Sequence, residues 1–406
     1  MSSRLYNLLL NASQKVKYYK DYFEKNDHLN RTLLSSYPII DKKPMMDNPI
    51  NFIASDEYID KLKIKKTSGF TTGQPFHIYK SIKDETAQSK ELWKRRIESG
   101  IYPQMKCLMF HLYEDDYFLY EKKNRNLLFI NASLFNKKLT SETMQDIHRI
   151  ITEYGPEYIM SAPTLLCNYI FYSLKFNISL PDIHYIETMR EFIFPFQKKY
   201  IQKYFLCPII NNYVCTEILP LAYNNSDCKF LYSFPQNVVF EILSQDGQIT
   251  QQTDVFGDIL VTGLNSHSMP FIRYRIGDMG KLICTKDGGE QKKQSLVLYP
   301  GRVSEYIRIN KQNIHISYIC KVFDEIDQSE LEINKFKYCY SALNNNMNLF
   351  ISLSNHNMFL EFQKQFTTWI NDNNYNALEW KIHSCDYEDF VQHSEKFKFF
   401  EECDGI

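Results

Sequence analysis

The stretch that decides the fold runs from Tyr158 to Tyr213 and reads YIMSAPTLLCNYIFYSLKFNISLPDIHYIETMREFIFPFQKKYIQKYFLCPIINNY. Apolar runs of strand length alternate in it with amphipathic runs of helix length. The elements expected are strands at 158–160, 183–186 and 208–213 and helices at 164–174 and 196–204. Strands that alternate with helices in this way predict an α/β fold with a largely parallel sheet.

The same alternation extends toward the N-terminus. The elements expected there are helices at 5–26 and 84–99, a loop at Pro38 and 41–51, strands at 105–112 and 127–129, and a helix that opens at Ser141. Gly100 and Pro103 are typical helix-ending residues and follow the second of these helices. The basic residues 61–66 predict a solvated strand that leads into a Gly-rich segment.

The pattern of apolar and turn-forming residues changes after residue 230. Short strands separated by Gly and Asp turns predict an antiparallel or barrel-like section, at 238–243, 257–262, 273–275 and 281–284, with a turn at 287–289. From about residue 302 the pattern is α+β, with strands at 306–309, 336–341 and 348–352 and a helix at 358–370. We therefore place a domain boundary at 300–304, which gives an N-terminal domain of residues 1–301 and a small C-terminal domain of residues 302–406.

Composition excludes some classes of function. The formal net charge of −1 gives no overall attraction to nucleic acid or to an anionic membrane, so neither partner is expected. No run approaches the roughly 18 apolar residues of a membrane-spanning helix. The ten cysteines show no Cys-x-x-Cys spacing, and even the loose set Cys207, Cys215, Cys228 and His267 does not predict a zinc site. We expect a soluble cytoplasmic protein with reduced thiols.

The segment Thr67-Ser-Gly-Phe-Thr-Thr-Gly73-Gln-Pro75 is the first candidate for chemistry. Glycines let backbone amides approach phosphate oxygens, and hydroxyl groups supply further donors. The segment lacks the Gly-Lys-Ser/Thr ending of the common nucleotide loop. By itself it is typical both of a phosphate loop and of a simple turn.

Four further segments are also candidates for functional motifs. They are Asn212-Tyr-Val-Cys-Thr-Glu217, Gly257-Asp-Ile-Leu-Val-Thr262, Met269-Pro-Phe-Ile-Arg-Tyr-Arg-Ile-Gly-Asp278, and Gly301-Arg302 before Tyr306-Ile-Arg-Ile309. With the loop at 67–75 they resemble, in the same order, the signature motifs of the acyl-adenylate-forming superfamily, which includes acyl-coenzyme A synthetases and nonribosomal adenylation domains. The phrase Met-Pro-Phe-Ile-Arg-Tyr-Arg and the early Tyr37-Pro-Ile-Ile-Asp-Lys42 are most similar to the phenylacetate-coenzyme A ligase and coenzyme F390 synthetase branch. The resemblance covers most of the chain.

This resemblance implies a fold and a nucleotide site. The fold is α/β, with a large N-terminal adenylation domain of mixed sheets and a barrel-like section, plus a small mobile α+β C-terminal domain. The residues implied at ATP are Ser68, Gly69, Thr71, Thr72 and Gly73 around the phosphates, Asn212 and Tyr213 at the adenine, Thr216 at the α-phosphate, Asp278 at the ribose hydroxyls, and Arg302 at ribose and phosphate. Glu217 would bind Mg²⁺, a hard cation that prefers carboxylate and phosphate oxygens.

The resemblance also implies an acyl pocket and a catalytic lysine. Ser161, Ala162, Pro163 and Val214 would form walls of the acyl pocket. The ending Glu395-Lys396-Phe-Lys398 resembles a motif whose lysine reaches the carboxylate and α-phosphate from the C-terminal domain. Lys396 is the implied catalytic residue, with Lys398 as the alternative, and Ser304 and Glu305 fall at the implied hinge. Read without the resemblance, these lysines also fit a solvated basic tail.

The implied reaction is ATP-dependent activation of a carboxylic acid, aromatic in the branch resembled, to an acyl-adenylate and pyrophosphate. The acyl group then passes to a thiol, either of coenzyme A or of a carrier protein's phosphopantetheine, as in natural product biosynthesis. Direct amide formation and a catalytically inactive adenylate- or acyl-binding homologue are the alternatives. The chain departs from the superfamily pattern at Phe70, at Val214, at Met189-Arg-Glu191 in place of Gly-Gly-Glu, and at Glu395 in place of Gly.

Overall fold

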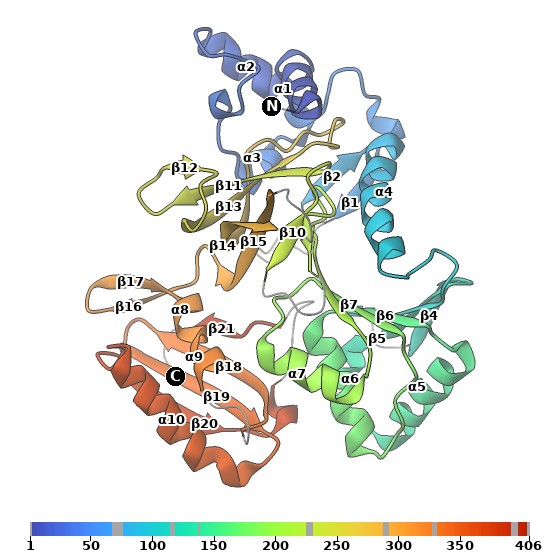
Figure 1. The fold of residues 1–406 in the computed structure, drawn as a ribbon, viewed down its shortest axis with the longest axis vertical. Coiled ribbons are helices and arrows are strands. Elements are labelled where there is room, and N and C mark those ends of the chain that lie inside the picture. Colours follow the sequence, from blue (N-terminus) through green and yellow to red (C-terminus); the bar gives the residue numbers. More distant parts are fainter. Residues whose placement is uncertain are drawn as a thin grey trace. The chain divides into compact units, whose positions relative to one another are not determined.

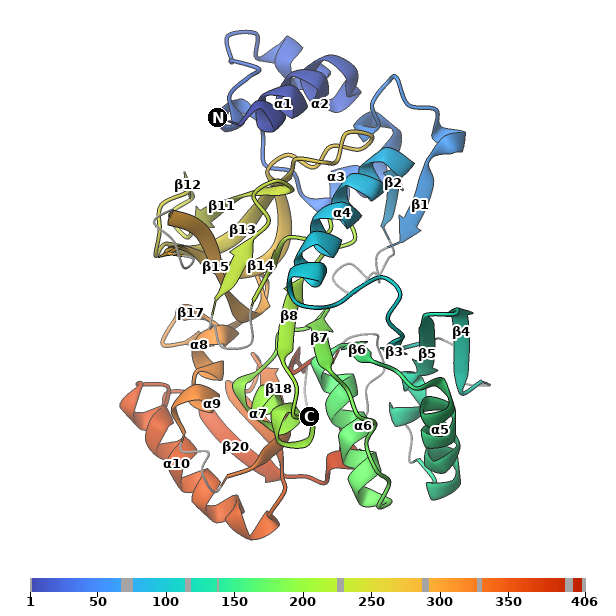
Figure 2. The same ribbon diagram turned by 45° about the vertical axis from the view of Figure 1, so that its right-hand side comes forward.

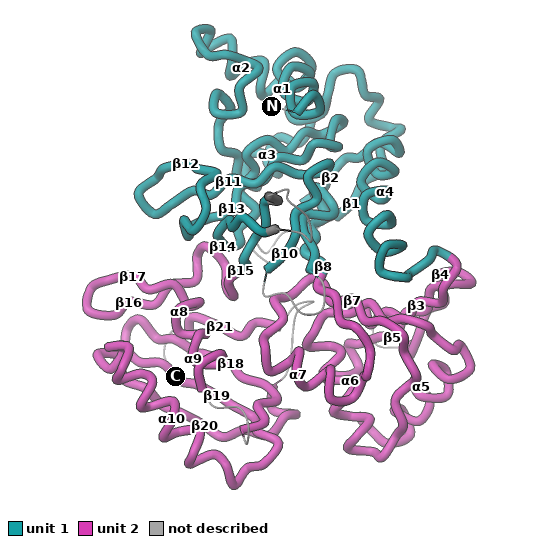
Figure 3. The backbone as a smooth tube through the Cα atoms, in the orientation of Figure 1, with its two compact units in different colours: residues 1–103, 212–298 teal, residues 104–211, 299–406 magenta. Residues whose placement is uncertain are grey.

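The computed structural model describes residues 2–66, 76–113, 118–136, 139–224, 230–286, 292–326, 331–390 and 397–403. The chain forms two compact units, each assembled from two separate parts of the sequence (Figure 3). Unit 1 contains residues 1–103 and 212–298, and unit 2 contains residues 104–211 and 299–406. The mixed α/β class predicted from the sequence is confirmed.

The N-terminal part of unit 1 is helical. Its elements are α1 (Ser3–Lys15), α2 (Lys17–Lys25), η1 (Leu34–Ser36), α3 (Lys42–Asp47), η2 (Pro49–Phe52) and η3 (Ile59–Lys61). The helix predicted at 5–26 is interrupted at Val16, whose extended backbone forms a β-bridge with Ala54. The prediction of a loop at 41–51 is wrong, because α3 and η2 form there. Met45 and Phe52 are buried, and Phe52 stacks on Tyr18, so apolar packing stabilises helical turns in a segment that looks polar.

A basic hairpin and a long helix follow in unit 1. Strand β1 (Lys63–Lys66) pairs antiparallel with β2 (His77–Lys80), and α4 (Ile82–Glu98) runs beside them (Figure 2). The Ser81 hydroxyl accepts the Asp84 backbone N–H and caps the helix. Lys63 and Lys65 both form ion pairs with Glu85 of α4. The predicted strand at the basic run and the predicted helix at 84–99 are both confirmed.

The rest of unit 1 is antiparallel β structure. Its strands are β9 (Ala222–Tyr223), β10 (Leu231–Ser233), β11 (Val238–Ser244), β12 (Ile249–Thr250), β13 (Phe256–Gly263), β14 (Tyr274–Lys286) and β15 (Lys292–Arg302), which ends in unit 2. They lie in the order β12-β11-β13-β14-β15-β10-β9. The two strands predicted at 273–275 and 281–284 are one strand, β14, because β13 pairs with both of its parts across a register shift. The turn predicted at 287–289 lies outside the described residues.

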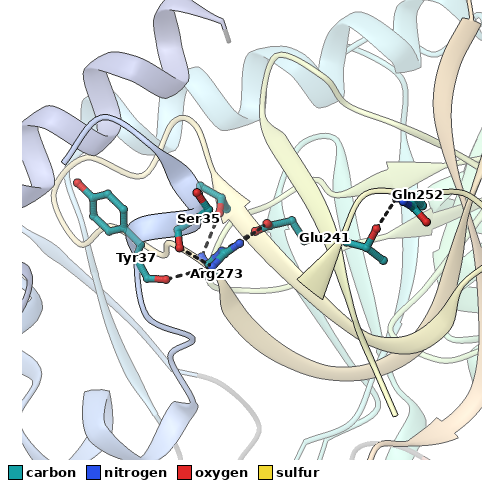
Figure 4. A network of polar contacts seen from close by, with 7 residues as sticks. Ser35, Tyr37, Glu241, Gln252 and Arg273 are labelled. Atoms are coloured by element: carbon teal, nitrogen blue, oxygen red, sulfur yellow. Dashed lines mark hydrogen bonds and ion pairs between the residues drawn. The ribbon is translucent and has the colours of Figure 1, made fainter. Parts of the chain in front are cut away.

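A buried ion pair fixes the entry into β14 (Figure 4). The Arg273 guanidinium donates from Nε and Nη2 to both carboxylate oxygens of Glu241, at 3.0 and 2.7 Å. Its Nη1 donates to the carbonyl oxygens of Ser35 and Tyr37. The Arg273 carbonyl oxygen accepts the Ile40 N–H, and the Arg275 N–H donates to the Ile40 carbonyl oxygen. One arginine therefore joins the N-terminal segment to β11 and β14.

Unit 2 begins with the predicted parallel sheet. Its elements are β3 (Cys107–His111), β4 (Tyr120–Asn124), β5 (Leu127–Asn131), η4 (Ala132–Asn136), α5 (Ser141–Tyr154), β6 (Tyr158–Ser161), α6 (Pro163–Lys175), β7 (Tyr185–Met189) and α7 (Pro195–Tyr204). Strands β5, β3, β6 and β7 are parallel neighbours, β4 is antiparallel to β5, and β8 (Ile209–Tyr213) lies next to β7 and runs on into unit 1. A buried apolar cluster lies between these strands and α5 and α6. The elements predicted over 105–213 are confirmed within a few residues.

The C-terminal part of unit 2 is α+β, as predicted. Its elements are β16 (Tyr306–Ile309), β17 (Gln312–His315), α8 (Ile316–Cys320), α9 (Val322–Glu325), β18 (Ile333–Ser341), β19 (Asn346–Leu353), η5 (His356–Met358), α10 (Phe359–Asp372), β20 (Glu379–Ser384), η6 (Tyr387–Asp389) and β21 (Phe400–Glu402). The sheet order is β20-β19-β18-β21, with α10 along the sheet (Figure 1). Phe194, just before α7, and Phe196, in its first turn, pack in the hydrophobic core of this C-terminal part. Residues 299–406 therefore cluster with 104–211, and a separately moving domain of residues 302–406 stays a prediction.

Cys339 and Cys403 form a disulfide that connects β18 to the residue after β21. The parallel pairing of β21 with β18 brings the two Cα atoms to 5.9 Å, a separation that disulfide geometry allows. The prediction that all cysteines are reduced is wrong for this pair. In the part of the chain that the structure describes, no helix has the length and apolar character needed to cross a membrane.

Replacing Arg273 by Met should lower the free energy of unfolding by about 3–5 kcal/mol, because Glu241 would be left as a buried, uncompensated charge. Urea denaturation measures this change. The control is Arg149→Met, which removes an exposed pair with Asp146 and should cost at most about 1 kcal/mol. Equal losses in the two variants would contradict the importance given to the Arg273–Glu241 pair.

Candidate active site

Two of the sequence motifs meet in unit 1 through reciprocal hydrogen bonds. The Tyr213 hydroxyl donates to Asp278 Oδ2 at 2.8 Å, across 65 residues of sequence. The Tyr274 hydroxyl donates to Glu217 Oε1 at 3.0 Å, across 57 residues. Each motif contains a tyrosine and, four residues later, an acid, and each tyrosine holds the acid of the other motif. Strands β8 and β14 thus bring the candidate metal-binding and ribose-binding carboxylates into one cluster.

A buried lysine, Lys80 of β2, accompanies this cluster and was missed by sequence reasoning. Its ammonium donates to Gln88 Oε1 at 2.8 Å. Burial lowers the pKa of Lys80 to about 8, while the nearby Cys215 and Glu217 act in the opposite direction. The available signal was its place at the end of the first strand after the Gly-rich loop. A cation close to Glu217 suits a site for polyanionic phosphate.

Asn212 leaves a polar atom without a partner. Its side chain is 3% exposed, and its Oδ1 is a buried acceptor with no hydrogen bond among the described residues. A buried, unsatisfied acceptor of this kind fits a donor supplied by a ligand, such as the amino group of adenine. Val214 and Thr216 follow in half-buried positions after β8. The phosphate-loop residues Ser68, Gly69, Thr71, Thr72 and Gly73 lie outside the described residues.

The candidate acyl-pocket residues lie in unit 2, where β6 ends and α6 begins. Ser161 closes the strand, Ala162 is the N-cap position, and Pro163 is the first helical residue. All three are buried. This is the carboxyl end of a parallel strand, the edge at which α/β sheets bind ligands. Burial at this edge is compatible with the wall of a pocket.

Two residues missed by sequence reasoning lie at the same edge, at the ends of β3 and β7, the strands on either side of β6. Arg190, just after β7, approaches His111 Nδ1 at the end of β3, with Nη1 at 3.3 Å. Burial, followed by the charge of Arg190, lowers the pKa of His111 to about 4, so the imidazole is neutral at pH 7 and Nδ1 accepts the hydrogen bond. The His111 ring contacts Tyr113 and Phe129, which gives the edge an aromatic lining. Their place at the ends of buried parallel strands was the available signal.

Gly301 and Arg302 form the end of β15, at the predicted domain boundary, where Glu305 contacts Arg302. The Arg302 N–H donates to Glu305 Oε2 at 2.9 Å, and the Arg302 carbonyl oxygen is 2.8 Å from His315 Nε2. Gly301 has a φ of +96°, and a Cβ there would lie 2.6 Å from Ile316. Arg302 belongs to unit 2, like Ser161, Ala162 and Pro163, whereas Tyr213, Glu217 and Asp278 belong to unit 1.

The C-terminal lysines are only partly described. Lys396 lies outside the described residues, and Lys398 is exposed, two residues before β21. Between these lysines, the Phe397 N–H donates to Glu191 Oε1 at 2.9 Å. Glu191 is the last residue of the Met-Arg-Glu departure noted in the sequence, and it lies directly after Arg190.

A second buried lysine, Lys335 of β18, was also not predicted from the sequence. It is 5% exposed, and burial lowers its pKa to about 8, while the charges of Glu191 and Cys167 act in the opposite direction. The alternation of β18 gave no signal, because Lys335 takes an inward position that an apolar residue would normally occupy.

No group of three or more potential metal ligands occurs among the described His, Cys, Asp and Glu residues. Glu217, which is 7% exposed, is the candidate ligand. One carboxylate is compatible with Mg²⁺, which usually keeps several waters and is bound by one or two carboxylates together with substrate phosphates.

The chain has the fold of the acyl-adenylate-forming enzymes. The solved structures that it resembles include a CoA ligase, two amide-forming synthetases and fatty acyl-adenylate ligases. A 2-hydroxyisobutyryl-CoA ligase in its postadenylation state aligns with a TM-score of 0.72 and 10% identity, over 98% of this chain and 88% of that chain. The GH3.15 acyl acid amido synthetase aligns with a TM-score of 0.62 and 12% identity, over 98% and 90%. The amide bond synthetase McbA from Marinactinospora thermotolerans aligns with a TM-score of 0.53 and 12% identity, over 81% and 66%.

Sequence comparison gives a weaker link. Protein CapK of Staphylococcus aureus is 23% identical over 291 residues, which cover 66% of this chain. The match spans 62% of the length of CapK, less than two thirds of it. No family profile matches the sequence.

The lowered pKa of Lys335 should be detectable in how the free energy of unfolding depends on pH. Its folded-state pKa is about 8 and its unfolded-state pKa about 10.4, so between these values the unfolded chain binds more protons and stability rises with pH. In Lys335→Met this rise should be smaller by up to about 1.4 kcal/mol per pH unit. Urea denaturation from about pH 7 to about pH 10 measures the slope. Lys337→Met, which removes a partly exposed lysine two residues along β18, should keep the wild-type slope.

Proposed function

We propose that this protein activates a carboxylic acid with ATP, forming an acyl-adenylate and pyrophosphate, and then transfers the acyl group to a second molecule. The single observation that carries the proposal is the reciprocal pair of hydrogen bonds, Tyr213 to Asp278 and Tyr274 to Glu217. It unites two acids from distant motifs, in a fold shared with acid-adenylating enzymes.

The unit 1 cluster has the groups that ATP needs. Asp278 offers carboxylate oxygens to ribose hydroxyls, and Asn212 offers a buried acceptor to the adenine amino group. The loop containing Ser68–Gly73 would surround the phosphates. Lys80 adds positive charge near Glu217, and Glu217 would hold Mg²⁺. Bound Mg²⁺ would neutralise negative charge on the phosphates.

The first half-reaction is an in-line displacement. A carboxylate oxygen of the substrate attacks the α-phosphorus, and a new P–O bond forms. The bond between the α-phosphorus and the bridging oxygen breaks, and pyrophosphate leaves with that electron pair. No proton is transferred, so no general base is required. Positioning and electrostatic stabilisation supply the catalysis, with Thr216, Arg302 and Lys396 as the proposed donors to the reacting phosphate.

The second half-reaction transfers the acyl group to a thiol. The thiol sulfur attacks the carbonyl carbon, AMP leaves with the electron pair of the C–O bond, and the thiol proton goes to solvent. Coenzyme A is the first candidate, because the 2-hydroxyisobutyryl-CoA ligase structure gives a high TM-score, and a carrier-protein thiol is the second. An amine acceptor has separate support, since GH3.15 and McbA are named as amide-forming enzymes.

The acid is proposed to be aromatic, bound near Ser161, Ala162, Pro163 and Val214. Support comes from the rings of Tyr113 and Phe129 around His111 at the carboxyl edge of the sheet. A small C-terminal domain that moves between the two half-reactions belongs to the same proposal, as does the phenylacetate-coenzyme A ligase branch. The Nδ1 of the neutral His111 imidazole accepts from Arg190, so His111 offers its Nε2–H as a donor at this edge, and Arg190 adds positive charge.

The direct test is exchange of labelled pyrophosphate into ATP, with Mg²⁺ and a panel of aryl and alkyl acids. Acid-dependent exchange supports adenylation, and the acid with the highest rate identifies the substrate class. ATP binding without exchange for any acid would favour the alternative of an inactive homologue. Absence of ATP binding would overturn the proposal.

Glu217→Gln should lower acid-dependent exchange by roughly 100-fold, because the neutral amide is a poor Mg²⁺ ligand at a site of developing charge. Initial rates at saturating ATP measure the loss. The matched control is Glu98→Gln, which neutralises an exposed glutamate of α4 paired with Arg95 and should leave the rate within about twofold. An unchanged rate in Glu217→Gln would remove Glu217 from the proposed metal site.

The acceptor is identified with the acyl-adenylate formed in place. Coenzyme A, a phosphopantetheinylated carrier protein and a panel of amines are supplied separately, and AMP release and acyl product are measured. We expect thioester formation with at least one of the two thiols. Product with amines alone would make the protein an amide ligase.

A further inference from the structure

We propose that Glu191 is a positioning residue, which fixes the C-terminal segment at Phe397 against the start of α6 and so keeps the adjacent lysine in register for adenylation. Glu191, Thr164, Phe397 and Lys335 are together called the Glu191 anchor. The inference rests on the proposed function for its catalytic consequence, whereas the anchor itself is defined by contacts within unit 2.

Glu191 joins two backbone donors that are far apart in the sequence. Its Oε2 accepts the N–H of Thr164 in the first turn of α6, at 3.3 Å and 27 residues away. Its Oε1 accepts the N–H of Phe397 at 2.9 Å, 206 residues away. The N-terminal turn of a helix has unpaired N–H groups and a positive dipole end, both of which favour a carboxylate there. The same carboxylate can therefore hold α6 and the C-terminal segment together.

Lys335 contacts the C-terminal segment that contains Phe390 and Phe397. Its ammonium donates to the Phe390 carbonyl oxygen at 3.2 Å and lies 4.9 Å from the centre of the Phe397 ring and 5.0 Å from that of Tyr387. Cation–π contacts of this kind gain strength when they are shielded from water. The ammonium therefore contacts residues on both sides of the stretch 391–396. Glu191 is among the groups whose charge favours the protonated form of Lys335, and Cys167 is the other.

The chain just before this stretch packs along α6. The Tyr387 hydroxyl donates to Asn168 Oδ1 at 2.5 Å, and the Tyr387 ring stacks on Phe171 at 4.0 Å. Glu388 forms an ion pair with Lys175. Helix α6 thus binds residues 387–388 along its length and, through Glu191, Phe397 at its start. The helix also begins at the candidate acyl-pocket residues. The same helix would therefore position both the substrate and the C-terminal segment.

The position of the anchor gives it a catalytic consequence. Phe397 lies between Lys396 and Lys398, the two candidates for the catalytic lysine. The hydrogen bond from its N–H to Glu191 fixes the backbone of the residue between the two candidates. Misplacement of a reacting group by about 1 Å can cost on the order of 100-fold in rate. Loss of the anchor should therefore slow adenylation, in which the lysine acts, and spare acyl transfer, in which it does not.

Glu191→Gln tests the anchor, because glutamine keeps the size of the side chain but removes its charge. We expect the maximal rate of acid-dependent pyrophosphate exchange to fall by roughly 10- to 100-fold, with the KM for ATP changed less than about threefold. Acyl transfer from a supplied acyl-adenylate should stay within about twofold of wild type. Glu191→Asp, which keeps the charge on a shorter side chain, should recover part of the exchange rate. The matched control, Glu332→Gln, removes an exposed pair between the residue before β18 and Lys203 of α7, and its exchange should equal that of wild type.

Hydrogen–deuterium exchange of the peptide covering residues 386–400 tests the anchor without any assumption about activity. Uptake at this peptide should be at least about tenfold faster in Glu191→Gln and in Lys335→Met than in Glu332→Gln. Unchanged uptake in both anchor variants would overturn the proposal, as would equal losses of exchange and acyl transfer in Glu191→Gln. Faster uptake in both anchor variants, combined with a wild-type protein that adenylates no acid, would uphold the anchor and refute the proposed function.

Discussion

The buried ion pair between Arg273 and Glu241 is the constraint on which the position of the Tyr–acid cluster in unit 1 depends. Removing two charges from water is costly, so the pair is stable only because the guanidinium also reaches the Ser35 and Tyr37 carbonyl oxygens. These bonds fix Arg273 at a positive φ, immediately before β14. Tyr274 is the next residue, and its hydroxyl holds Glu217. The geometry of a buried arginine thus determines where the candidate metal ligand points.

Hydrogen bonds from tyrosine suit the two acids better than ion pairs would. An arginine or lysine bonded directly to Glu217 or Asp278 would neutralise the carboxylate and compete with Mg²⁺ or ribose for its oxygens. A phenol orients the carboxylate, leaves its charge in place, and leaves further lone pairs open. Lys80 contributes positive charge close by, while its own hydrogen bond goes to Gln88. Orientation and charge are therefore supplied by different residues.

Much of the fold was predictable because its signals are local. The alternation over 158–213 predicted β6 to β8 and the helices between them, and the cap and stop residues of α4 are readable in the sequence. The failures are long-range in origin. Helix α3 and the continuity of β14 through residues 276–280 depend on tertiary partners, namely the packing of Met45 and the pairing with β13. The Tyr–acid motifs could be found by resemblance, but their reciprocal bonding, Lys80 and the Glu191–Phe397 contact join residues far apart in sequence and follow only from the folded chain.

The two buried lysines bear on whether the protein is a catalyst or an inactive homologue. Both lie in environments that lower their pKa to about 8, so each ammonium is held at neutral pH against a desolvation penalty. Replacing such a group by an apolar residue of similar volume is commonly neutral or stabilising, so packing alone gives no reason to keep it. Each lysine lies beside an acid with a proposed role, Lys80 near Glu217 and Lys335 near Glu191. Because perturbed pKa values cluster at functional sites, the two lysines favour a working site over an inactive homologue that has kept only the fold.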